Sequence, residues 1–127
     1  MKKLLLLTLL AGFFITGRAQ TKPVLLATIK TPTALCATCK TKIETYLKRH
    51  DGILEVNVNF RKGETRVKYV TDRTDIEQIK TAIANCGYDA DDVTANEESY
   101  KRLPQSCKKP EDGGAHPKPR PAPPAGQ

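Results

Sequence analysis

The order in which apolar patterns follow one another limits the fold of this chain more than any other feature. Strand patterns are rich in β-branched residues or alternate apolar with polar side chains, and they occur at residues 24–31, 53–60, 64–70 and 88–95. Helix patterns place apolar side chains three and four positions apart, and they occur at residues 37–49 and between Thr74 and Gly87. The last strand pattern is short and acidic.

The resulting order, βαββαβ, predicts an α+β fold of the ferredoxin-like type. Because crossover connections are right-handed, we expect an antiparallel sheet in the order 4-1-3-2 with two helices on one face. Arg61, Lys62 and Gly63 are expected to form the hairpin turn between the second and third strands.

Composition divides the chain into four parts. These are a signal peptide, a domain, a short C-terminal extension and a disordered tail, at residues 1–19, 22–96, 97–107 and 108–127. The tail is rich in Pro and Lys and has no large apolar residue, so we expect it to bury no core.

The first residues have the pattern of an export signal. Lys2 and Lys3 precede an apolar run, and Gly17 and Ala19 supply the small residues that a signal peptidase requires. The run is short for a bilayer span, so we expect a soluble monomer in the periplasm or outside the cell that is not membrane-embedded. Without the three basic residues of the signal the net charge falls from +7 to +4, which gives no case for nucleic-acid binding.

Cys36 and Cys39 stand where the first strand pattern gives way to a helix pattern. Two cysteines at i and i+3 around a helix start can direct both sulfurs toward one point. The unpaired N–H groups that open the helix favour the thiolate, which is the form that binds metal. The motif alone fits a metal site, a redox dithiol or a structural disulfide.

Motifs in both halves of the chain resemble the heavy-metal-associated domain family. They are Cys36-x-x-Cys39, Asp51-Gly52-Ile53, Val56-Asn57-Val58 and Gly87-Tyr88-Asp89-Ala90. The family includes copper chaperones, N-terminal domains of metal-pumping ATPases and exported mercuric-ion-binding proteins. One position departs from its pattern, because Thr33-Ala34-Leu35 stands where the family has a core methionine two residues before the first cysteine. We expect Leu35 or a shifted loop to fill that space.

The resemblance implies a protein that is not an enzyme. It would bind one soft metal ion through Cys36 and Cys39 and pass it on by ligand exchange. Two thiolates form a soft donor set that favours Cu(I), with Hg(II), Zn(II) and Cd(II) as alternatives. The implied partner is a metal-transporting membrane protein or another CxxC metal-binding domain. Two other functions stay open, a thiol–disulfide oxidoreductase that uses the same cysteines and a non-transporting adaptor module.

Cys86, Cys107 and Tyr88 are candidates for accessory roles at the metal. Cys86 follows Ile83 by three positions on the helix stripe that packs on the sheet, which favours a buried cysteine over a ligand. Cys107 could reach the site, pair with Cys86 or stay free, and Tyr88 could shield the metal or simply pack. We expect neither cysteine to be required for basic metal binding, although either could raise the coordination from two sulfurs to three.

The signal pattern predicts that the exported protein begins at Gln20. Intact-mass measurement of the periplasmic or secreted protein should show the loss of residues 1–19, because cleavage follows the small residue Ala19. A mass that retains residues 1–19 would contradict export as a soluble protein.

Overall fold

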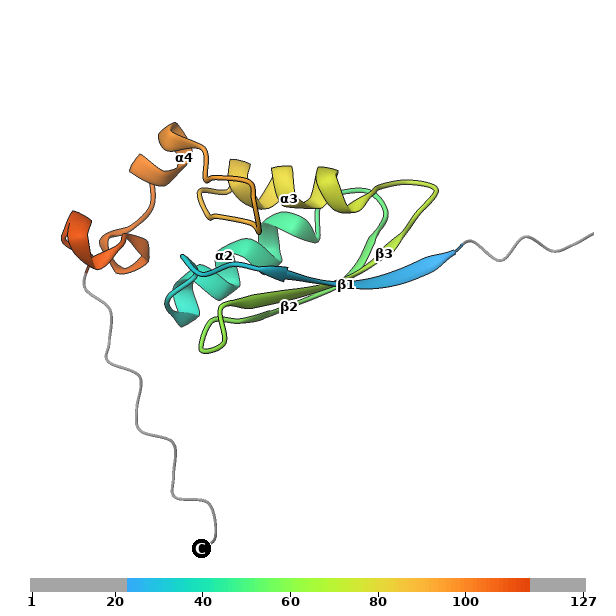
Figure 1. Ribbon diagram of the computed structural model, residues 1–127, viewed down its shortest axis with the longest axis horizontal. Helices are drawn as coiled ribbons and strands as arrows, with labels where there is room; N and C mark the ends of the chain where they lie inside the picture. The colour runs from blue at the N-terminus through green and yellow to red at the C-terminus, as the bar shows by residue number, and fades with distance from the viewer. Residues whose placement is uncertain (1–22, 115–127) are drawn as a thin grey trace, which may run out of the picture.

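The computed structural model describes residues 23–114 (Figure 1). The elements in chain order are β1 (Val24–Lys30), α2 (Ala37–Leu47), β2 (Ile53–Asn59), β3 (Glu64–Val70), α3 (Ile76–Asn85), α4 (Glu97–Lys101), η1 (Gln105–Cys107) and η2 (Pro110–Asp112). The strands form one sheet, and helices α2 and α3 lie together on one face of it (Figure 1). The short elements after α3 lie at the end of the molecule where α2 begins (Figure 1).

β3 is the central strand of the sheet. It pairs antiparallel with β1 on one side and with β2 on the other, in the order β1-β3-β2. The expected alternation is present in β2, where Val56 and Val58 are buried. Their neighbours Asn57 and Asn59 are exposed. The α+β architecture with two helices on one face of an antiparallel sheet is therefore confirmed for these elements.

The predicted fourth strand at residues 88–95 is wrong, and with it the four-strand order 4-1-3-2. Within the described part of the chain, this segment forms a single isolated bridge, between Ala90 and Val93. Asp91 has a left-handed backbone with φ of 51°, and the Asp89 carboxylate accepts a hydrogen bond from a backbone N–H six residues ahead. Carboxylates that bind nearby backbone groups favour turns over strands. The segment therefore curls instead of extending along the edge of β1.

The core lies between the sheet and the two helices. α2 buries Cys39, Ile43 and Leu47, which are spaced by four residues. α3 buries Ile79 and Ile83 with the same spacing. Burial of one large aliphatic side chain stabilises a fold by about 1.5–3 kcal/mol. This shared apolar contact fixes the orientation of α2, and hence the place of its first turn.

Polar contacts fix the loop that leads from β1 to α2. The buried hydroxyls of Thr31 and Thr65 share a hydrogen bond of 2.9 Å. The Thr31 N–H donates to the Gly63 carbonyl at 2.7 Å, and the Thr31 carbonyl accepts from the Ala34 N–H at 3.1 Å. Because both ends of this short loop are held, the first turn of α2 starts from a defined position.

The chain beyond residue 95 packs back onto the domain. The Asn96 N–H donates to the Ala84 carbonyl near the end of α3 at 2.8 Å. Leu103 and Cys107 are then buried against the core. The extension is therefore part of the folded unit.

Ordered structure continues past the point where a disordered tail was expected. Residues 108–114 contain η2, and Asp112 accepts a hydrogen bond from the Tyr100 hydroxyl. The tail prediction is thus wrong for these residues. Residues 115–127 and the predicted signal peptide lie outside the described residues.

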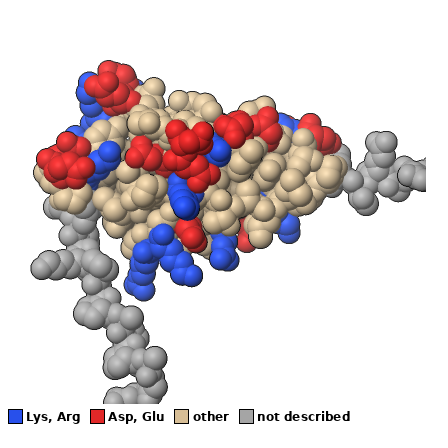
Figure 2. Space-filling view, in the orientation of Figure 1, with Lys and Arg blue, Asp and Glu red and all other residues tan. Residues whose placement is uncertain are grey.

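Charged side chains of both signs lie on the face shown in Figure 2. Asp and Glu predominate along the side of α3 and α4, with Lys and Arg among them, and Lys and Arg predominate on the opposite side, over the sheet. No helix between residues 23 and 114 combines the length and the apolar character needed to cross a bilayer.

Two glycines provide a matched test of how closely the extension packs. Gly63 and Gly87 both have positive φ, at 66° and 102°. A Cβ at Gly87 would lie 3.1 Å from the Ser99 carbonyl oxygen, whereas one at Gly63 would meet its nearest atom at 3.4 Å. We expect Gly63→Ala to lower the free energy of unfolding by about 1–2 kcal/mol, the cost of the left-handed backbone, and Gly87→Ala to lower it further. Urea denaturation of both variants measures this, and equal losses would contradict the close packing of α4 on Gly87.

Candidate metal centre

Cys36 is the residue that caps the start of α2. Its backbone is extended, with φ of −150° and ψ of 173°, and Cys39 follows in the first helical turn. This geometry directs both side chains to the same side, so their Sγ atoms lie 3.1 Å apart. The sequence spacing predicted that these two sulfurs would meet, and the structure brings them together.

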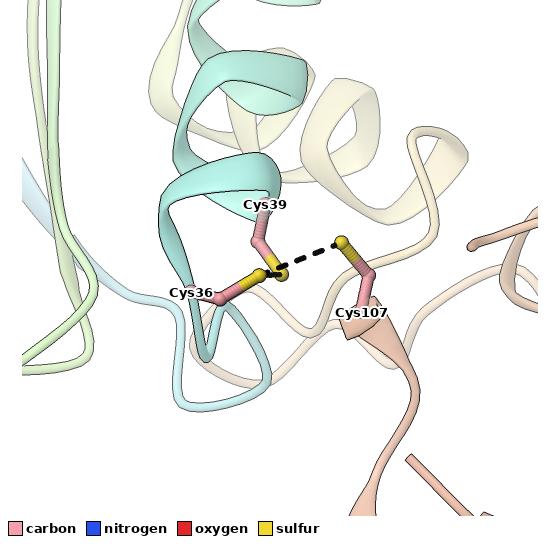
Figure 3. A group of neighbouring side chains, drawn as sticks. All are labelled: Cys36, Cys39 and Cys107. Carbon is pink, nitrogen blue, oxygen red and sulfur yellow. Dashed lines mark hydrogen bonds between the residues drawn. The ribbon is translucent and has the colours of Figure 1, made fainter. Parts of the chain in front are cut away.

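Cys107 brings a third sulfur to the same place. Its Sγ lies 3.9 Å from the Sγ of Cys36, and the sulfurs of Cys36, Cys39 and Cys107 all lie within 4.8 Å of one another. Figure 3 shows the side chains converging from α2 and from η1, which are far apart in the sequence. The Cys36 thiol also donates to the Ser106 carbonyl oxygen at 3.3 Å. The extension therefore contacts the site directly.

The remaining cysteine lies apart from this group. Cys86 ends α3 and is buried, and its sulfur has the Lys42 carbonyl oxygen as its contact, at 4.0 Å. The expectation that it packs inward agrees with this position. Among the described residues, no His, Asp or Glu joins the three sulfurs in a potential metal-binding group.

The loop before Cys36 departs from the expectation for the missing methionine. Ala34, which stands two residues before Cys36, is fully buried, whereas Leu35 is only half-buried. The small side chain of Ala34 thus occupies the inward position, and Leu35 does not replace the methionine there.

Tyr88 lies fully buried beside the sulfurs. Within the described residues its hydroxyl has no hydrogen-bond partner. Burial raises its pKa far above the ordinary range, and the neighbouring sulfurs of Cys107 and Cys39 raise it further. Tyr88 is therefore a neutral hydroxyl, next to the sulfurs, that still has a proton to donate.

The environment separates the pKa values of Cys36 and Cys39. Burial raises the pKa of the Cys36 thiol, but hydrogen bonds from the Cys39 side chain and backbone, from Cys107 and from the Thr38 N–H outweigh it, so its pKa lies below the ordinary value. Burial and hydrogen bonds with Cys107 and Cys36 raise the pKa of Cys39 to about 12. Of the two, Cys36 is the sulfur that becomes a thiolate first.

The chemistry of this site follows from its donors. Sulfur is a soft, polarisable ligand that prefers Cu(I) and other soft ions over Mg²⁺ or Ca²⁺. The sulfurs come from a helix start and from a separate segment, so only an ion bound by all three would join α2 to the extension. The site thus has the composition of a soft-metal centre.

Comparisons with known proteins agree with this chemistry. Residues 28–89 match the family described as the heavy-metal-associated domain. A copper-exporting P-type ATPase of Staphylococcus aureus is 33% identical over 67 residues, which are 53% of this chain and 8% of that protein. The chain therefore spans only a small part of the curated relatives that it matches.

Solved structures show the same fold. The CopZ metallochaperone is 29% identical, with a TM-score of 0.50 over 52% of this chain and 98% of that one. The soluble region of the P-type ATPase CopA from Bacillus subtilis is 28% identical, with a TM-score of 0.52 over 54% of this chain and 46% of that one. Oxidised MerP from Ralstonia metallidurans CH34, at 20% identity and a TM-score of 0.51, shares the fold and covers 54% of this chain and 94% of that one.

The separated pKa values predict which thiol ionises first. In the reduced, metal-free protein the ultraviolet absorbance of thiolate should begin to rise below the ordinary cysteine pKa of about 8.5, because the pKa of Cys36 is lowered. Cys36→Ser should remove this first step. Cys86→Ser is the control and should leave it intact, because burial raises the pKa of Cys86 to about 11. A first step that persists in Cys36→Ser would contradict the assignment.

Proposed function

Residues 28–89 are a heavy-metal-associated domain, and from this premise we propose that the protein binds one soft metal ion and passes it on. Cys36 and Cys39 are the ligands of the proposed site. Cu(I) is the proposed ion, with Hg(II), Zn(II) and Cd(II) as alternatives. The role would be that of a metallochaperone or a scavenger, and no bond in a substrate is made or broken.

The convergence of sulfurs at the start of α2 is the observation that carries this proposal. The Sγ atoms of Cys36 and Cys39 lie 3.1 Å apart, and no His, Asp or Glu of the described residues joins them. A donor set of sulfur alone selects soft ions by ligand type. Structural zinc sites usually have four protein ligands, and a site with fewer ligands leaves room for exchange.

Ligand exchange is the proposed mechanism of transfer. A thiolate of a partner adds to the bound ion, and one of the original sulfurs leaves and regains a proton. Cys36 has the lower pKa, so it is the better leaving group of the pair. The ion keeps its oxidation state throughout.

The proposed partner is a metal-transporting membrane protein or another CxxC metal-binding domain. The similarity of this chain to part of a copper-exporting ATPase supports such a pairing. The face in Figure 2 carries both signs of charge, and Lys40 of α2 is paired with Glu44 at 3.4 Å. Recognition would therefore rest on local contacts around the site and not on net charge.

We also propose that the protein acts in the periplasm or outside the cell. The support is the signal pattern of residues 1–19. In an oxidising compartment, two sulfurs this close would form a disulfide when no metal is bound. This favours one second function, a thiol–disulfide oxidoreductase that uses Cys36 and Cys39. Against it, the described residues provide too few βα units for a thioredoxin-like fold.

The metal-binding proposal predicts the effect of removing both sulfurs of the motif. The reduced protein should take one Cu(I) from a chromophoric chelator, and the Cys36→Ser, Cys39→Ser double variant should not compete measurably, because Cys107, the one sulfur of the group that remains, gives no chelate. Cys86→Ser should bind like the parent, since Cys86 lies outside the sulfur group. Unchanged Cu(I) binding in the double variant would show that the site lies elsewhere.

A further inference from the structure

We propose that Cys107 is a third metal ligand, so that this protein holds its ion in a closed, three-sulfur site formed by Cys36, Cys39 and Cys107. The inference rests on the proposed function, because it assigns a further residue to the same site. The ligand is a soft ion that accepts three thiolates in a plane, such as Cu(I) or Hg(II).

Cys107 lies outside the part of the chain that matches the metal-binding family. That match ends at residue 89, and η1 begins at Gln105. The third sulfur therefore comes from the extension of this chain, where a two-cysteine site would have solvent or a partner.

The burial of Cys107 differs in kind from that of Cys86. Both side chains are buried, at 1% and 4% exposure, and buried cysteine commonly behaves as a small apolar residue. Cys86 fits that description, because it lies apart from the other sulfurs. Cys107 instead faces the sulfurs of Cys36 and Cys39 within 4.8 Å.

The distances between the sulfurs fit three-coordination better than two. With metal–sulfur bonds of about 2.3 Å, the length found for zinc thiolates, three sulfurs in a plane around an ion lie about 4.0 Å apart, and two sulfurs in a line lie about 4.6 Å apart. The Cys36–Cys107 distance is already 3.9 Å. The Cys36–Cys39 distance of 3.1 Å must open by about 0.9 Å for the trigonal arrangement, and by more for the linear one.

A set of contacts made by Tyr100 holds the extension that carries Cys107. Its hydroxyl accepts a hydrogen bond from the Lys109 N–H at 2.9 Å and donates to the Asp112 carboxylate at 2.5 Å. The Lys109 ammonium also lies 5.8 Å from the centre of the Tyr100 ring, within reach of a cation–π contact. These contacts close the chain on both sides of η1, so the position of the sulfur is defined by the fold.

Tyr88 offers a partner for the charge that such a site would carry. Three thiolates around Cu(I) or Hg(II) leave a net negative charge on the sulfurs. The Tyr88 hydroxyl is buried without a hydrogen-bond partner among the described residues, and it lies next to Cys39 and Cys107. A donated O–H···S hydrogen bond would satisfy the hydroxyl and stabilise the thiolates.

A third internal ligand changes how the ion is released. On binding, each of the three thiols gives its proton to solvent and forms one sulfur–metal bond, and no electrons are transferred. In a two-sulfur site the third position is open to the thiolate of a partner. Here Cys107 occupies it, so one of the three internal sulfurs must be displaced before the thiolate of a partner can bind, and the protein retains its ion more strongly than a two-sulfur site would.

The number of sulfurs around the metal tests this inference. X-ray absorption of the full-length, reduced chain loaded with one Cu(I), and in parallel with one Hg(II), should show three sulfurs in the parent. Cys107→Ser should show two, with an affinity lower by at least about 10- to 100-fold, the loss that removal of a group hydrogen-bonded to a metal ligand already causes. Cys86→Ser is the matched control, another buried cysteine, and should keep three sulfurs and the parent affinity.

Each outcome decides between the two proposals. A parent that binds no metal would overturn the proposed function together with this inference. A parent that binds through two sulfurs would overturn only the inference, even if Cys107→Ser failed to fold. Three sulfurs that persist in Cys107→Ser would also overturn it. A drop to two sulfurs in Cys86→Ser would name Cys86 as the third ligand instead.

A second variant tests the position of the sulfur while keeping it. Tyr100→Phe removes the hydroxyl contacts to Lys109 and Asp112 but leaves all three cysteines. We expect the bound Cu(I) to keep three sulfurs and to pass to an added chelator faster than in the parent, because Cys107 can move away more often. A transfer rate equal to that of the parent would show that these contacts do not hold the third ligand in place.

Discussion

The contact between α2 and the sheet is the interaction on which the site depends. Ile43 and Leu47 are fully buried in it, and Cys39 continues the same stripe one turn earlier. The Glu44 carboxylate also accepts a hydrogen bond from the Val58 N–H at 2.9 Å, which ties the helix to an edge strand. Because the helix is fixed along its length, its first turn cannot rotate, and the sulfur at position 39 points at a defined place. The geometry of the proposed metal site therefore depends on ordinary aliphatic packing.

The sequence was sufficient for the elements whose patterns are long enough to read. Strands with alternating side chains and helices with apolar stripes formed where these patterns lay. The fourth strand failed because residues 88–95 carry aspartates that compete for backbone hydrogen bonds. Asp91 exchanges two hydrogen bonds with Lys30 at the end of β1, at 2.7 and 2.8 Å, and then turns away. A residue whose side chain bonds to the neighbouring backbone in this way stops the strand pairing there, and β-propensity does not predict this effect.

The site, like the fold, has one part that the sequence predicted and one part that it did not. The approach of Cys36 to Cys39 is local, set by a helix start, and follows from spacing. The approach of Cys107 spans 71 residues from Cys36 and depends on how a short extension folds back, for which five- and three-residue elements give no readable period. A signal was nonetheless present. Leu103 and Tyr100 are apolar residues ahead of Cys107, and Leu103 is buried, as a segment that returns to the core requires.

The three sulfurs differ in solvent exposure, so the site is accessible from one side. Cys36 is 7% exposed, whereas Cys39 and Cys107 are at 0% and 1%. In the proposed site, an ion that arrives from solvent would therefore meet Cys36 first, and a partner thiolate would approach from the same side. Desolvation of the two enclosed sulfurs disfavours free thiolates there and favours thiolates whose charge a metal neutralises. In the proposed site, this arrangement favours capture of the ion at the accessible Cys36, enclosure by the two buried sulfurs, and transfer to a partner through Cys36.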